Sequence, residues 1–380
     1  MTNSLRCWAE VDLDALRGNL AWIRHRVGPE VKILTVVKSD AYGHGLKQIA
    51  ALLMQSGTDI FGVANLTEAR AIRSVGKGWP VLMLGACLPD EVEQAVVEDV
   101  MPTISTLPEA KQFSRAAARL KRQARIHVKV DTGMGRLGVA PEQARKLIVQ
   151  VNRLPNLKLE GLYTHYSSVE DDAKFSRTQR QRLEGVLAEL ATDGIQVPLI
   201  HANNSGAIMH EPRTRFDLVR PGLVAYGIVP LGRRRVDWTL TNRLRPALAF
   251  KCRVSLVKDI RRGTSLSYGR TFVARRTMRV ATLTAGYGDG YSRAASNRSK
   301  VLIGGVRCPV LGRVTMDQMM VDVSRVRKVR AGDEAVLIGR QGRDEITASE
   351  LAAWCGTVPW EILTGISYRV PRIYRGGQAA

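Results

Sequence analysis

The 380-residue chain has few aromatic residues, no paired cysteines and no long apolar run. Its five cysteines, Cys7, Cys87, Cys252, Cys308 and Cys355, are scattered and form no C-x-x-C pair, which argues against a disulfide framework and against a zinc site. No apolar stretch approaches the ~20 residues of a membrane span, and the first residues lack the apolar segment of a signal peptide. We therefore expect a soluble, cytoplasmic protein that has no membrane partner.

Acidic residues are also scarce, with 35 Asp and Glu against 57 Lys and Arg, which gives a formal net charge of +22. Such an excess is typical of proteins that bind nucleic acids or anionic surfaces. The basic clusters at 233–235, 275–276 and 325–330 are short, however, and the aromatic residues, 6% of the chain, do not alternate with them. We favour an enzyme with dispersed basic residues and predict no nucleic-acid partner.

The first 230 residues alternate between two patterns. Short apolar runs are separated by segments with helical spacing of apolar residues, which predicts a parallel sheet with helical crossovers. The runs are ILTVVKS, FGVAN, VLMLGA, PTIST, IHVKVDT, LEGLYTHYS, LIHANNS and LVRPGLVAYG. Their number predicts an α/β fold, a (β/α)8 TIM-type barrel, with an open doubly wound sheet as the alternative.

The pattern changes after Trp238. Strand-like runs follow one another, separated by Gly-Gly, Arg-Gly and Ala-Gly-Asp turns, which predicts antiparallel hairpins and one short helix near SELAAWCG. We therefore place the barrel in residues 1–240 and a mainly β domain in residues 241–380, with their junction in GRRRVDWTLTN.

Polar side chains recur where the apolar runs of the barrel end. In a parallel barrel these ends share one face, and active sites are built there. The residues are Lys38, Lys129, Arg136, His165, Asn204, Ser205, Arg220 and Gly222. Each alone has an ordinary explanation, such as a lysine that reaches solvent or a serine that caps a helix. Their convergence on one face predicts a functional site.

The segment VKVDTGMGRLG matches a dinucleotide-binding pattern. Gly133, Gly135 and Gly138 form G-x-G-x-x-G, and Glu160 follows at a suitable distance for a ribose contact. A Rossmann dehydrogenase is therefore a rival hypothesis. The pattern normally belongs to the first βα turn, whereas this segment follows a fifth strand, and Arg136 within the loop indicates an anionic group instead. We interpret the match as coincidental.

The chemistry of the strand ends suggests a cofactor. A lysine at the end of an apolar strand has a lowered pKa and forms imines readily. The turns Asn204-Ser205-Gly206 and Pro221-Gly222 suit a phosphate. A cofactor that has both an aldehyde and a phosphate is pyridoxal 5′-phosphate (PLP), which we predict. An arginine at its pyridine nitrogen would leave that nitrogen unprotonated and would favour simple proton transfer.

Eight motifs in the order of the chain resemble those of alanine racemases. They are VVKSDAYGHG, KVDTGMGRLG, HANNSGA, VRPGLVAYG, SLSYGRTF, GYGDGY, GRVTMDQ and SYRVPRIY, between residues 34 and 374. The resemblance implies a PLP-dependent racemase that interconverts L- and D-alanine by a two-base mechanism and supplies D-alanine for peptidoglycan. It also implies a homodimer whose two chains share active sites.

The resemblance further implies the roles of individual residues. Lys38 would hold PLP as an internal aldimine and act as the base on one face of the substrate, and Tyr268 would be the base on the other face. His165 and Arg220 would stabilise the ionised form of Tyr268, and Arg220 would face the pyridine nitrogen. The other implied cofactor contacts are His165, Tyr42, Asn204, Ser205, Gly222, Leu223 and Trp360. The implied substrate contacts are Arg136, Met316, Asp317 and Tyr287. Lys129 matches a position that is carbamylated in many members.

Four features depart from the family pattern. Trp360 stands where most members have tyrosine, Thr315 replaces a common cysteine, Ser39 replaces a common alanine, and HYSSVED differs from the usual His-Phe-Ala. A preference for serine or for broader substrates therefore stays open. Further alternatives are a PLP-dependent decarboxylase of similar architecture, whose C-x-x-C-D-G-like motif is absent, and a non-catalytic PLP-binding protein, which would lack the second domain.

Overall fold

The computed structural model describes residues 4–211, 216–237, 239 and 242–377, and the chain divides into two compact units. The first, called the barrel unit below, comprises Leu16–Ala41 and Leu46–Arg245. The second, called the β unit, comprises Met1–Ala15, Tyr42–Gly45 and Pro246–Ala380. The domain boundary expected at residue 240, and part of the expected junction at 232–242, lie outside the described residues.

The barrel unit is built on a nine-stranded parallel sheet of order β5-β4-β3-β2-β10-β9-β8-β7-β6. Its strands are β2 (Lys32–Val36), β3 (Ile60–Val63), β4 (Val81–Met83), β5 (Val100–Met101), β6 (Thr103–Ile104), β7 (Ala124–Lys129), β8 (Leu157–Tyr163), β9 (Leu199–Asn204) and β10 (Leu218–Arg220). Eight of these strands coincide with the eight predicted runs, and β5 lies directly before the run PTIST, which contains β6.

Pro102 separates β5 from β6 and closes the ring. A proline has no N–H to donate to a ladder, so the strand is interrupted there. β5 pairs with β4, β6 pairs with β7, and the carbonyl of Pro102 accepts a hydrogen bond from the N–H of His127 at 3.0 Å. The two ends of the sheet are therefore consecutive in the chain, and the predicted (β/α)8 barrel is confirmed.

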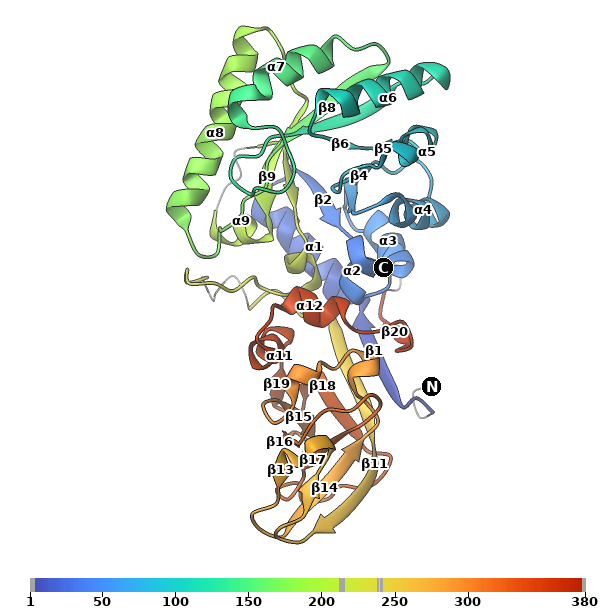
Figure 1. Ribbon diagram of the computed structural model, residues 1–380, viewed down its shortest axis with the longest axis vertical. Coiled ribbons are helices and arrows are strands. Elements are labelled where there is room, and N and C mark those ends of the chain that lie inside the picture. Colours follow the sequence, from blue (N-terminus) through green and yellow to red (C-terminus); the bar gives the residue numbers. More distant parts are fainter. Residues whose placement is uncertain (1–3, 212–215, 238, 240–241, 378–380) are drawn as a thin grey trace. The chain divides into compact units, whose positions relative to one another are not determined.

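Helices follow the strands of this sheet, and the longer crossover helices lie on its outer face (Figure 1). They are α1 (Leu13–Val27), α2 (Lys38–Gly43), α3 (Leu46–Met54), α4 (Leu66–Val75), η1 (Pro89–Glu91), α5 (Val92–Val97), α6 (Leu107–Arg119), α7 (Pro141–Asn152), α8 (Ala173–Thr192), α9 (Ser205–His210) and η2 (Leu223–Tyr226). Side chains of Asn65, Thr106 and Asp172 cap α4, α6 and α8 by accepting backbone N–H groups. Local capping chemistry thus starts several crossovers where the sequence predicts them.

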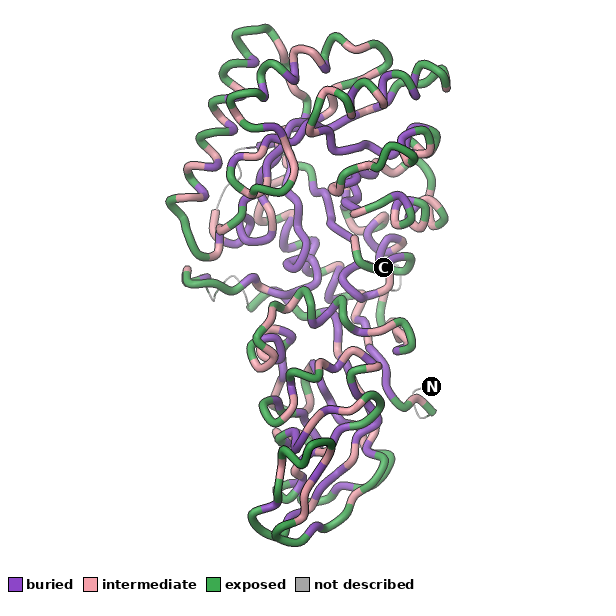
Figure 2. The backbone as a smooth tube through the Cα atoms, in the orientation of Figure 1, coloured by how far each residue is buried: buried purple, intermediate pink, exposed green. Residues whose placement is uncertain are grey.

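Burial follows the layers of the barrel unit. The strands carry continuous buried stretches, as in β3 and β4, whereas helices such as α4, α6 and α7 bury one face (Figure 2). Such continuous burial is typical of a parallel sheet that is covered by helices on its outer side and filled by side chains on its inner side. No described helix has both the length and the apolar character needed to cross a membrane.

The β unit contains a second nine-stranded sheet, of order β19-β18-β15-β16-β17-β14-β11-β1-β20, with an added β18–β11 pairing. Its strands are β1 (Cys7–Asp12), β11 (Leu248–Ile260), β12 (Ser265–Leu266), β13 (Phe272–Val273), β14 (Met278–Leu283), β15 (Lys300–Ile303), β16 (Val306–Leu311), β17 (Met319–Asp322), β18 (Glu334–Gln341), β19 (Asp344–Ile346) and β20 (Arg372–Arg375), of which β12 and β13 form a separate pair. Its helices are η3 (Tyr268–Arg270), η4 (Tyr287–Asp289), η5 (Arg293–Ala295), α11 (Ala348–Cys355) and α12 (Pro359–Thr364).

Of the turns predicted to form hairpins, Gly-Gly does so, whereas Arg262-Gly263 and Ala331-Gly332-Asp333 connect strands that do not pair with each other. β15 and β16 are joined by Gly304 and Gly305, whose φ angles of 58° and 76° suit the two-residue turn that matches strand twist. The short helix predicted near SELAAWCG is α11, and α12 follows it as an element that was not predicted.

β1 differs from the expected division of the chain, which assigned residues 1–240 to the barrel. It pairs antiparallel with β11 and parallel with β20, and therefore belongs to the sheet of the β unit. Trp8, Ala9 and Val11 are fully buried there. Both pairing partners lie more than two hundred residues away in the sequence, so no local pattern reveals the assignment.

The loop that carries G-x-G-x-x-G does not resemble a dinucleotide site. The carboxylate of Asp131 accepts hydrogen bonds from the N–H groups of Gly133, Met134 and Gly135 at 2.8–3.0 Å, so these donors are turned inward. A Cβ on Gly138 would lie 2.7 Å from the backbone nitrogen of Asp131 and 3.0 Å from the carbonyl oxygen of Lys129. Gly138 therefore serves close backbone packing, and the Rossmann hypothesis is wrong for this closed barrel.

Gly138→Ala should lower the melting temperature. Its φ of 118° is unfavourable for alanine and the added methyl group meets backbone, so we expect a loss of at least about 2 kcal/mol in the free energy of unfolding. The matched control is Gly185→Ala in α8, where an added Cβ meets nothing within 4 Å. It should stabilise the chain by about 0.5–1 kcal/mol. Thermal unfolding of both variants tests this, and an unchanged melting temperature for Gly138→Ala would contradict it.

Candidate functional site

The predicted polar residues of the barrel unit gather at the carboxyl ends of its strands. Lys129, Asn204 and Arg220 are the last residues of β7, β9 and β10, and Lys38 lies two residues beyond β2. His165 lies two residues beyond β8, although the sequence placed it within the strand. Gly222 likewise follows β10 and stands just before η2. Ser205 begins α9, and Arg136 lies in the loop after β7.

Four cationic side chains, those of Lys38, Lys129, Arg136 and Arg220, influence one another at this mouth. Burial and the Arg136 charge lower the pKa of Lys38, which Glu68 only partly offsets. Burial, Arg136 and Arg220 lower the pKa of Lys129 to about 8. Lysine amines whose protonated form is disfavoured act as nucleophiles and bases. The mouth is therefore positively charged and carries two reactive amines, a combination that suits an anionic aldehyde.

Arg220 is the most enclosed of these cations, with 3% of its surface exposed. Burial lowers its pKa to about 10, which leaves the guanidinium charged at neutral pH. Its NH2 donates to the carbonyls of Thr164 and Ala202 at 2.8 and 2.9 Å and lies 3.3 Å from Nδ1 of His165. Because a guanidinium can only donate, Nδ1 of His165 accepts and the ring carries its proton on Nε2. Burial, followed by the charge of Arg220, holds the pKa of His165 well below its usual range.

The segment that follows Lys38 has an unusual backbone. Ser39, Asp40, Ala41 and Tyr42 all have φ near 53°, so α2 is a left-handed turn. Non-glycine residues pay about 1–2 kcal/mol each in this region. Hydrogen bonds offset part of this cost, since the N–H of Ser39 donates to Glu68 at 2.7 Å and Asp40 accepts from Leu46 at 2.7 Å. Strain of this kind clusters at functional sites, and it fixes the position of Lys38.

Gly43 and Gly45, the glycines of the motif VVKSDAYGHG, predict a tight turn into the next helix, and they continue this turn with φ angles of 78° and 95°. Within the β unit, a Cβ on Gly43 would lie 2.3 Å from the carbonyl oxygen of Leu363, and one on Gly45 would overlap the hydroxyl of Tyr374. Tyr42 is 6% exposed, and burial raises the pKa of its phenol, so the hydroxyl stays protonated and can donate. Both glycines are therefore needed for close packing as well as for positive φ.

Ser205 marks a cradle for an anion. Its Oγ accepts the N–H groups of Gly222 at 2.9 Å and of Val224 at 3.4 Å, so backbone donors from the start of η2 converge on the first residue of α9. Converging N–H groups bind phosphate, and a phosphate held here would take these two donors from the serine hydroxyl, which is a single neutral acceptor and not a carboxylate. With the amine of Lys38 and the cation of Arg220, this donor set fits PLP. The side chain of Asn204 caps α9 at Ala207 and donates to the carbonyl of Tyr166, and its contact with the cofactor stays a prediction.

The predicted site residues of the β unit lie on its surface. Tyr268 is 72% exposed, Met316 53%, Tyr287 43% and Trp360 37%, which is unusual for side chains of this size. Ser267, which precedes Tyr268, has a φ of 63°, and its hydroxyl donates to the carbonyl of Arg313 at 2.6 Å. The tyrosine is thus presented on an anchored, strained turn.

Arg369 holds the loop that contains Met316. Its guanidinium donates to Asp289 at 2.9 Å and to Asp317 at 2.8 Å, and the N–H of Gly288 donates to the carbonyl of Met316 at 2.8 Å. Hydrogen bonds from Arg369 therefore occupy the carboxylate that was predicted to touch substrate, and the geometry favours a supporting role for Asp317.

Three site residues escaped the sequence-based prediction: His127, His201 and Tyr163, all fully or almost fully buried. His201 lies 2.7 Å from NH1 of Arg220, and the ring of Tyr163 stacks on that of His201 with centroids 4.6 Å apart. The sequence could have indicated His127 as a site residue, because His127 and Lys129 are two residues apart on β7 and therefore point to the same side of the sheet. Polar residues at inward positions of apolar strands mark the interior of the site.

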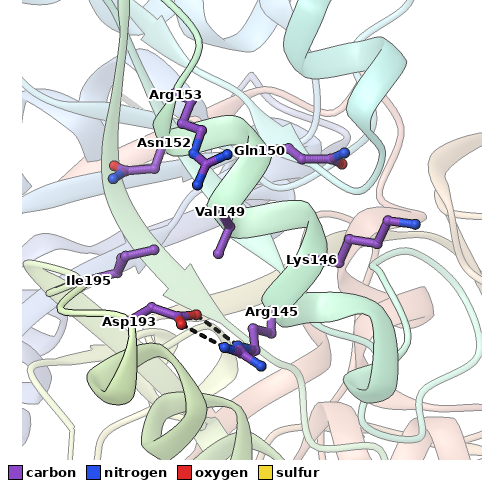
Figure 3. Close-up of a pocket in the computed structure, with 8 residues that line it drawn as sticks. All are labelled: Arg145, Lys146, Val149, Gln150, Asn152, Arg153, Asp193 and Ile195. Atoms are coloured by element: carbon purple, nitrogen blue, oxygen red, sulfur yellow. Dashed lines mark hydrogen bonds and ion pairs between the residues drawn. The ribbon is translucent and has the colours of Figure 1, made fainter.

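A groove of about 580 Å³ lies on the outer helices, between α7 and the turn after α8 (Figure 3). Arg145 there forms a two-fold hydrogen bond with Asp193 at 2.6 and 2.8 Å, while Lys146 and Arg153 point elsewhere. Asn152 and Asp193 stand at the carboxyl ends of α7 and α8, which lead back to the amino ends of strands. The groove therefore lies away from the face where barrel enzymes place their chemistry.

Comparison with known proteins follows the same two units. The family model "Alanine racemase, N-terminal domain" matches residues 11–230, and "Alanine racemase, C-terminal domain" matches residues 247–374. The chain is 43% identical over 374 residues to an alanine racemase of Symbiobacterium thermophilum, with 98% of each chain covered. It is 44% identical over 368 residues to one of Carboxydothermus hydrogenoformans, with 97% of this chain and 99% of the relative covered.

A solved structure of similar fold is alanine racemase from Streptomyces coelicolor, with a TM-score of 0.91, 31% identity and 98% of both chains covered. The barrel with its reactive lysine, the β unit and these matches define an isomerase that acts on amino acids. More narrowly, the chain belongs to the alanine racemase family.

Arg136→Gln should raise the pKa of Lys38, because it removes a cation that disfavours the protonated amine. Less neutral amine is then present at a given pH, so the cofactor-free chain should take up PLP with a pH midpoint above that of the wild type. The measurement is the visible absorbance that develops after PLP is added across a pH series. Arg153→Gln, on the outer groove, is the control and should leave the midpoint in place. Equal midpoints for Arg136→Gln and wild type would contradict the electrostatic coupling.

Proposed function

We propose that this chain works as a cytoplasmic homodimer that interconverts L- and D-alanine with PLP, and that its product serves peptidoglycan synthesis. The observation that carries the proposal is the half-buried amine of Lys38 among the cations of Lys129, Arg136 and Arg220 at the mouth of a family-typical barrel. The family membership supports the reaction, and the site supports the residue roles below.

The cofactor would be held by the groups already described. Bound PLP supplies an aldehyde for an amine and an electron-withdrawing ring that acidifies the α-hydrogen of an amino acid. Lys38 would bind that aldehyde, and Ser205, Gly222 and Leu223 would hold the phosphate at the start of η2, with Tyr42 as a further hydroxyl donor. Trp360 would contribute its indole N–H where most family members have tyrosine.

Arg220 would face the ring nitrogen with its permanent positive charge. A cation at this place disfavours protonation of the nitrogen, and no described carboxylate forms a salt bridge with Arg220 that would reverse this effect. The ring is then a weaker electron sink, which restricts the site to proton transfer at the α-carbon. The same charge explains why PLP chemistry that needs a stronger sink, such as decarboxylation, is not favoured.

Substrate would bind through its carboxylate. Arg136 is exposed at the barrel mouth, and the backbone of Met316 is presented by the loop that Arg369 supports. An arginine guanidinium is suited to a carboxylate because it offers parallel donors. Tyr287 would limit the size of the side chain that is accepted.

Two bases on opposite faces would move the α-hydrogen. Lys38 would take or return the proton at its Nζ, and the hydroxyl of Tyr268 would do so on the other face. Inversion of a stereocentre through a planar state needs such a pair. Nε2–H of His165 is the donor that remains on the ring once Nδ1 accepts from Arg220, so it would stabilise the ionised phenol.

Tyr268 would act in the active site of a second copy of this chain. Its 72% exposure, together with the exposed Met316, Tyr287 and Trp360, makes a surface of large side chains on the β unit. Clusters of this type mark protein interfaces. A symmetric dimer in which each chain lends this surface to its partner would complete two identical sites.

Lys129 is proposed to be carbamylated, as the family resemblance implies. Its pKa of about 8 makes the neutral amine accessible at physiological pH, and a neutral amine adds to the carbon of CO2 with loss of one proton. The resulting negative charge would lie beside Arg136 and would orient it. It would also reduce the mutual repulsion of the four cations.

Tyr268→Phe should keep the visible absorbance of bound PLP and lose turnover of L-alanine by about 10²–10⁴-fold, because only the proton carrier on one face is removed. Lys38→Ala should lose both colour and turnover. The assay follows racemisation of alanine, serine and larger amino acids in D2O, with CO2 measured in parallel.

The matched control is Tyr368→Phe, which changes a fully exposed tyrosine of the β unit outside the proposed site. It should turn over alanine like the wild type. Deuterium at the α-carbon without CO2 supports racemisation, whereas CO2 release without deuterium exchange would overturn it. Undiminished turnover in Tyr268→Phe would remove this residue from the mechanism.

Mixing of two inactive variants tests the shared site. In a hybrid dimer of Lys38→Ala and Tyr268→Phe chains, one site receives both intact bases and the other receives neither. Random exchange should therefore restore about a quarter of wild-type activity. The activity is measured after the variants are unfolded and refolded together, with separately refolded chains as control. No recovery in mixtures that contain hybrid dimers would place both bases on the same chain.

A further inference from the structure

Behind Arg220 the barrel interior contains two histidines that the roles above do not use. NH1 of Arg220 lies 2.7 Å from Nδ1 of His201, and Nε2 of His201 lies 3.0 Å from Nδ1 of His127. Both histidines have no exposed surface. The three side chains come from β10, β9 and β7 and form a continuous line of hydrogen bonds across the barrel.

The direction of each hydrogen bond in this line is determined. A guanidinium only donates, so Nδ1 of His201 accepts and its single proton is on Nε2. That proton is donated to Nδ1 of His127, whose own proton is therefore also on Nε2. Nε2 of His127 finds no partner among the described residues. The line thus begins at the cation and ends at a buried N–H, with both rings in the same tautomer.

Neighbouring groups hold both rings in place. Tyr163 stacks on His201 with an interplanar angle of 4°, and its hydroxyl lies 2.7 Å from that of Thr103, which itself donates to the carbonyl of Met83. Tyr163 must therefore donate to Thr103. His127 lies directly over Gly161, where a Cβ would be 2.2 Å from Nδ1 of the imidazole. Only glycine at this position leaves room for the ring.

The hydrogen bonds of Arg220 within the described part of the chain are formed by its two terminal nitrogens. NH1 is used by His201, and NH2 by Thr164, Ala202 and His165. Within the described part of the chain, no hydrogen bond is formed by its Nε–H. The orientation of the guanidinium thus depends on the acceptors at its two terminal nitrogens, and His201 is the only side chain among them that is backed by a second one.

We propose that His201 and His127, seated on Gly161, are positioning residues that fix the rotation of the Arg220 guanidinium, so that its Nε–H is the donor presented to the ring nitrogen of the cofactor. The proposal rests on the proposed function, because it concerns the group that faces PLP. It assigns no contact with substrate or cofactor to either histidine.

The electrostatics agree with this geometry. Burial and the charge of Arg220 hold the pKa of His201 well below its usual range, and burial with the charges of Arg125 and Arg220 lowers the pKa of His127 to about 3. Both rings are therefore neutral whenever Arg220 is charged. A protonated His201 would direct a hydrogen at the guanidinium and would repel it.

The test compares His201→Leu, which removes the acceptor, with His201→Asn, whose side-chain oxygen takes the place of Nδ1. His201→Leu should lower kcat about 10- to 100-fold with a smaller change in KM, and His201→Asn should recover most of the loss. In the same variants, the 15N shift of 15N-labelled PLP should change for leucine and return towards wild type for asparagine. His210→Leu, a histidine at the end of α9, is the control and should change neither.

Gly161→Ala provides an independent variant that keeps every polar group and displaces only His127. Like His201→Leu, it should lower kcat and change the 15N shift of the PLP ring nitrogen. If His201→Leu does not fold, Gly161→Ala tests whether the histidines position Arg220. A wild-type kcat together with a wild-type 15N shift of the ring nitrogen in a folded variant would overturn the proposal.

Nitrogen-correlated NMR of the cofactor-free chain tests the hydrogen-bond line without PLP. His201 and His127 should both appear as neutral Nε2–H tautomers, and Gly161→Ala should shift the His127 signals. A Nδ1–H tautomer at His201 would overturn the proposal even if PLP binds. If His201 and His127 of the wild-type chain both show the Nε2–H tautomer but the chain takes up no PLP, the proposed function is contradicted and the positioning of Arg220 by the histidines is not.

Discussion

The mutual repulsion of the cations at the mouth of the barrel is the constraint on which the rest of the site depends. Lys38 follows β2, Lys129 and Arg136 belong to the end of β7 and the loop after it, and Arg220 ends β10. Arg136 lowers the pKa of Lys38, and Arg136, Arg220 and Lys38 lower that of Lys129. A parallel barrel is suited to this, because strand ends hold side chains close together on rigid elements. The result is an amine whose pKa is lowered in surroundings that attract anions.

Three of these cations, Lys38, Arg136 and Arg220, are held in place by different local structures. Lys38 precedes a left-handed turn whose strain is offset by Glu68 and Asp40. Arg136 lies in a loop whose N–H groups are gathered by Asp131. Arg220 is fixed by carbonyls and by the line of histidines. The unfavourable charge cluster is thus maintained by a scaffold that leaves its members little freedom to separate.

In the β unit, the side chains of the predicted site are exposed to solvent. Its sheet buries a conventional apolar core, yet the large side chains that carry the predicted chemistry are exposed, above all Tyr268. A chain that keeps a strained, anchored turn and an exposed tyrosine on its surface has a physical reason to associate with a second copy. In the proposed dimer, the strained turn and the exposed Tyr268 would complete the active site of the partner chain.

Much of the fold and part of the site could be predicted from the sequence, because the determining interactions are local. Alternation of apolar runs with helical spacing specified the eight barrel strands, Gly304-Gly305 specified a hairpin, and Gly43 with Gly45 specified a turn after Lys38. Family motifs added the identities of the residues that would bind PLP. In each case a few neighbouring residues contain the whole signal.

What only the tertiary structure decided are the interactions between distant segments. β1 pairs with strands more than two hundred residues away, and Pro102 closes the barrel through partners on both sides. The line from Arg220 through His201 to His127 needs three strands in register, with Gly161 on a fourth. The sequence determined which residues are chemically able to act. The fold determined which of them meet, because burial and hydrogen-bond direction exist only once the strands are assembled.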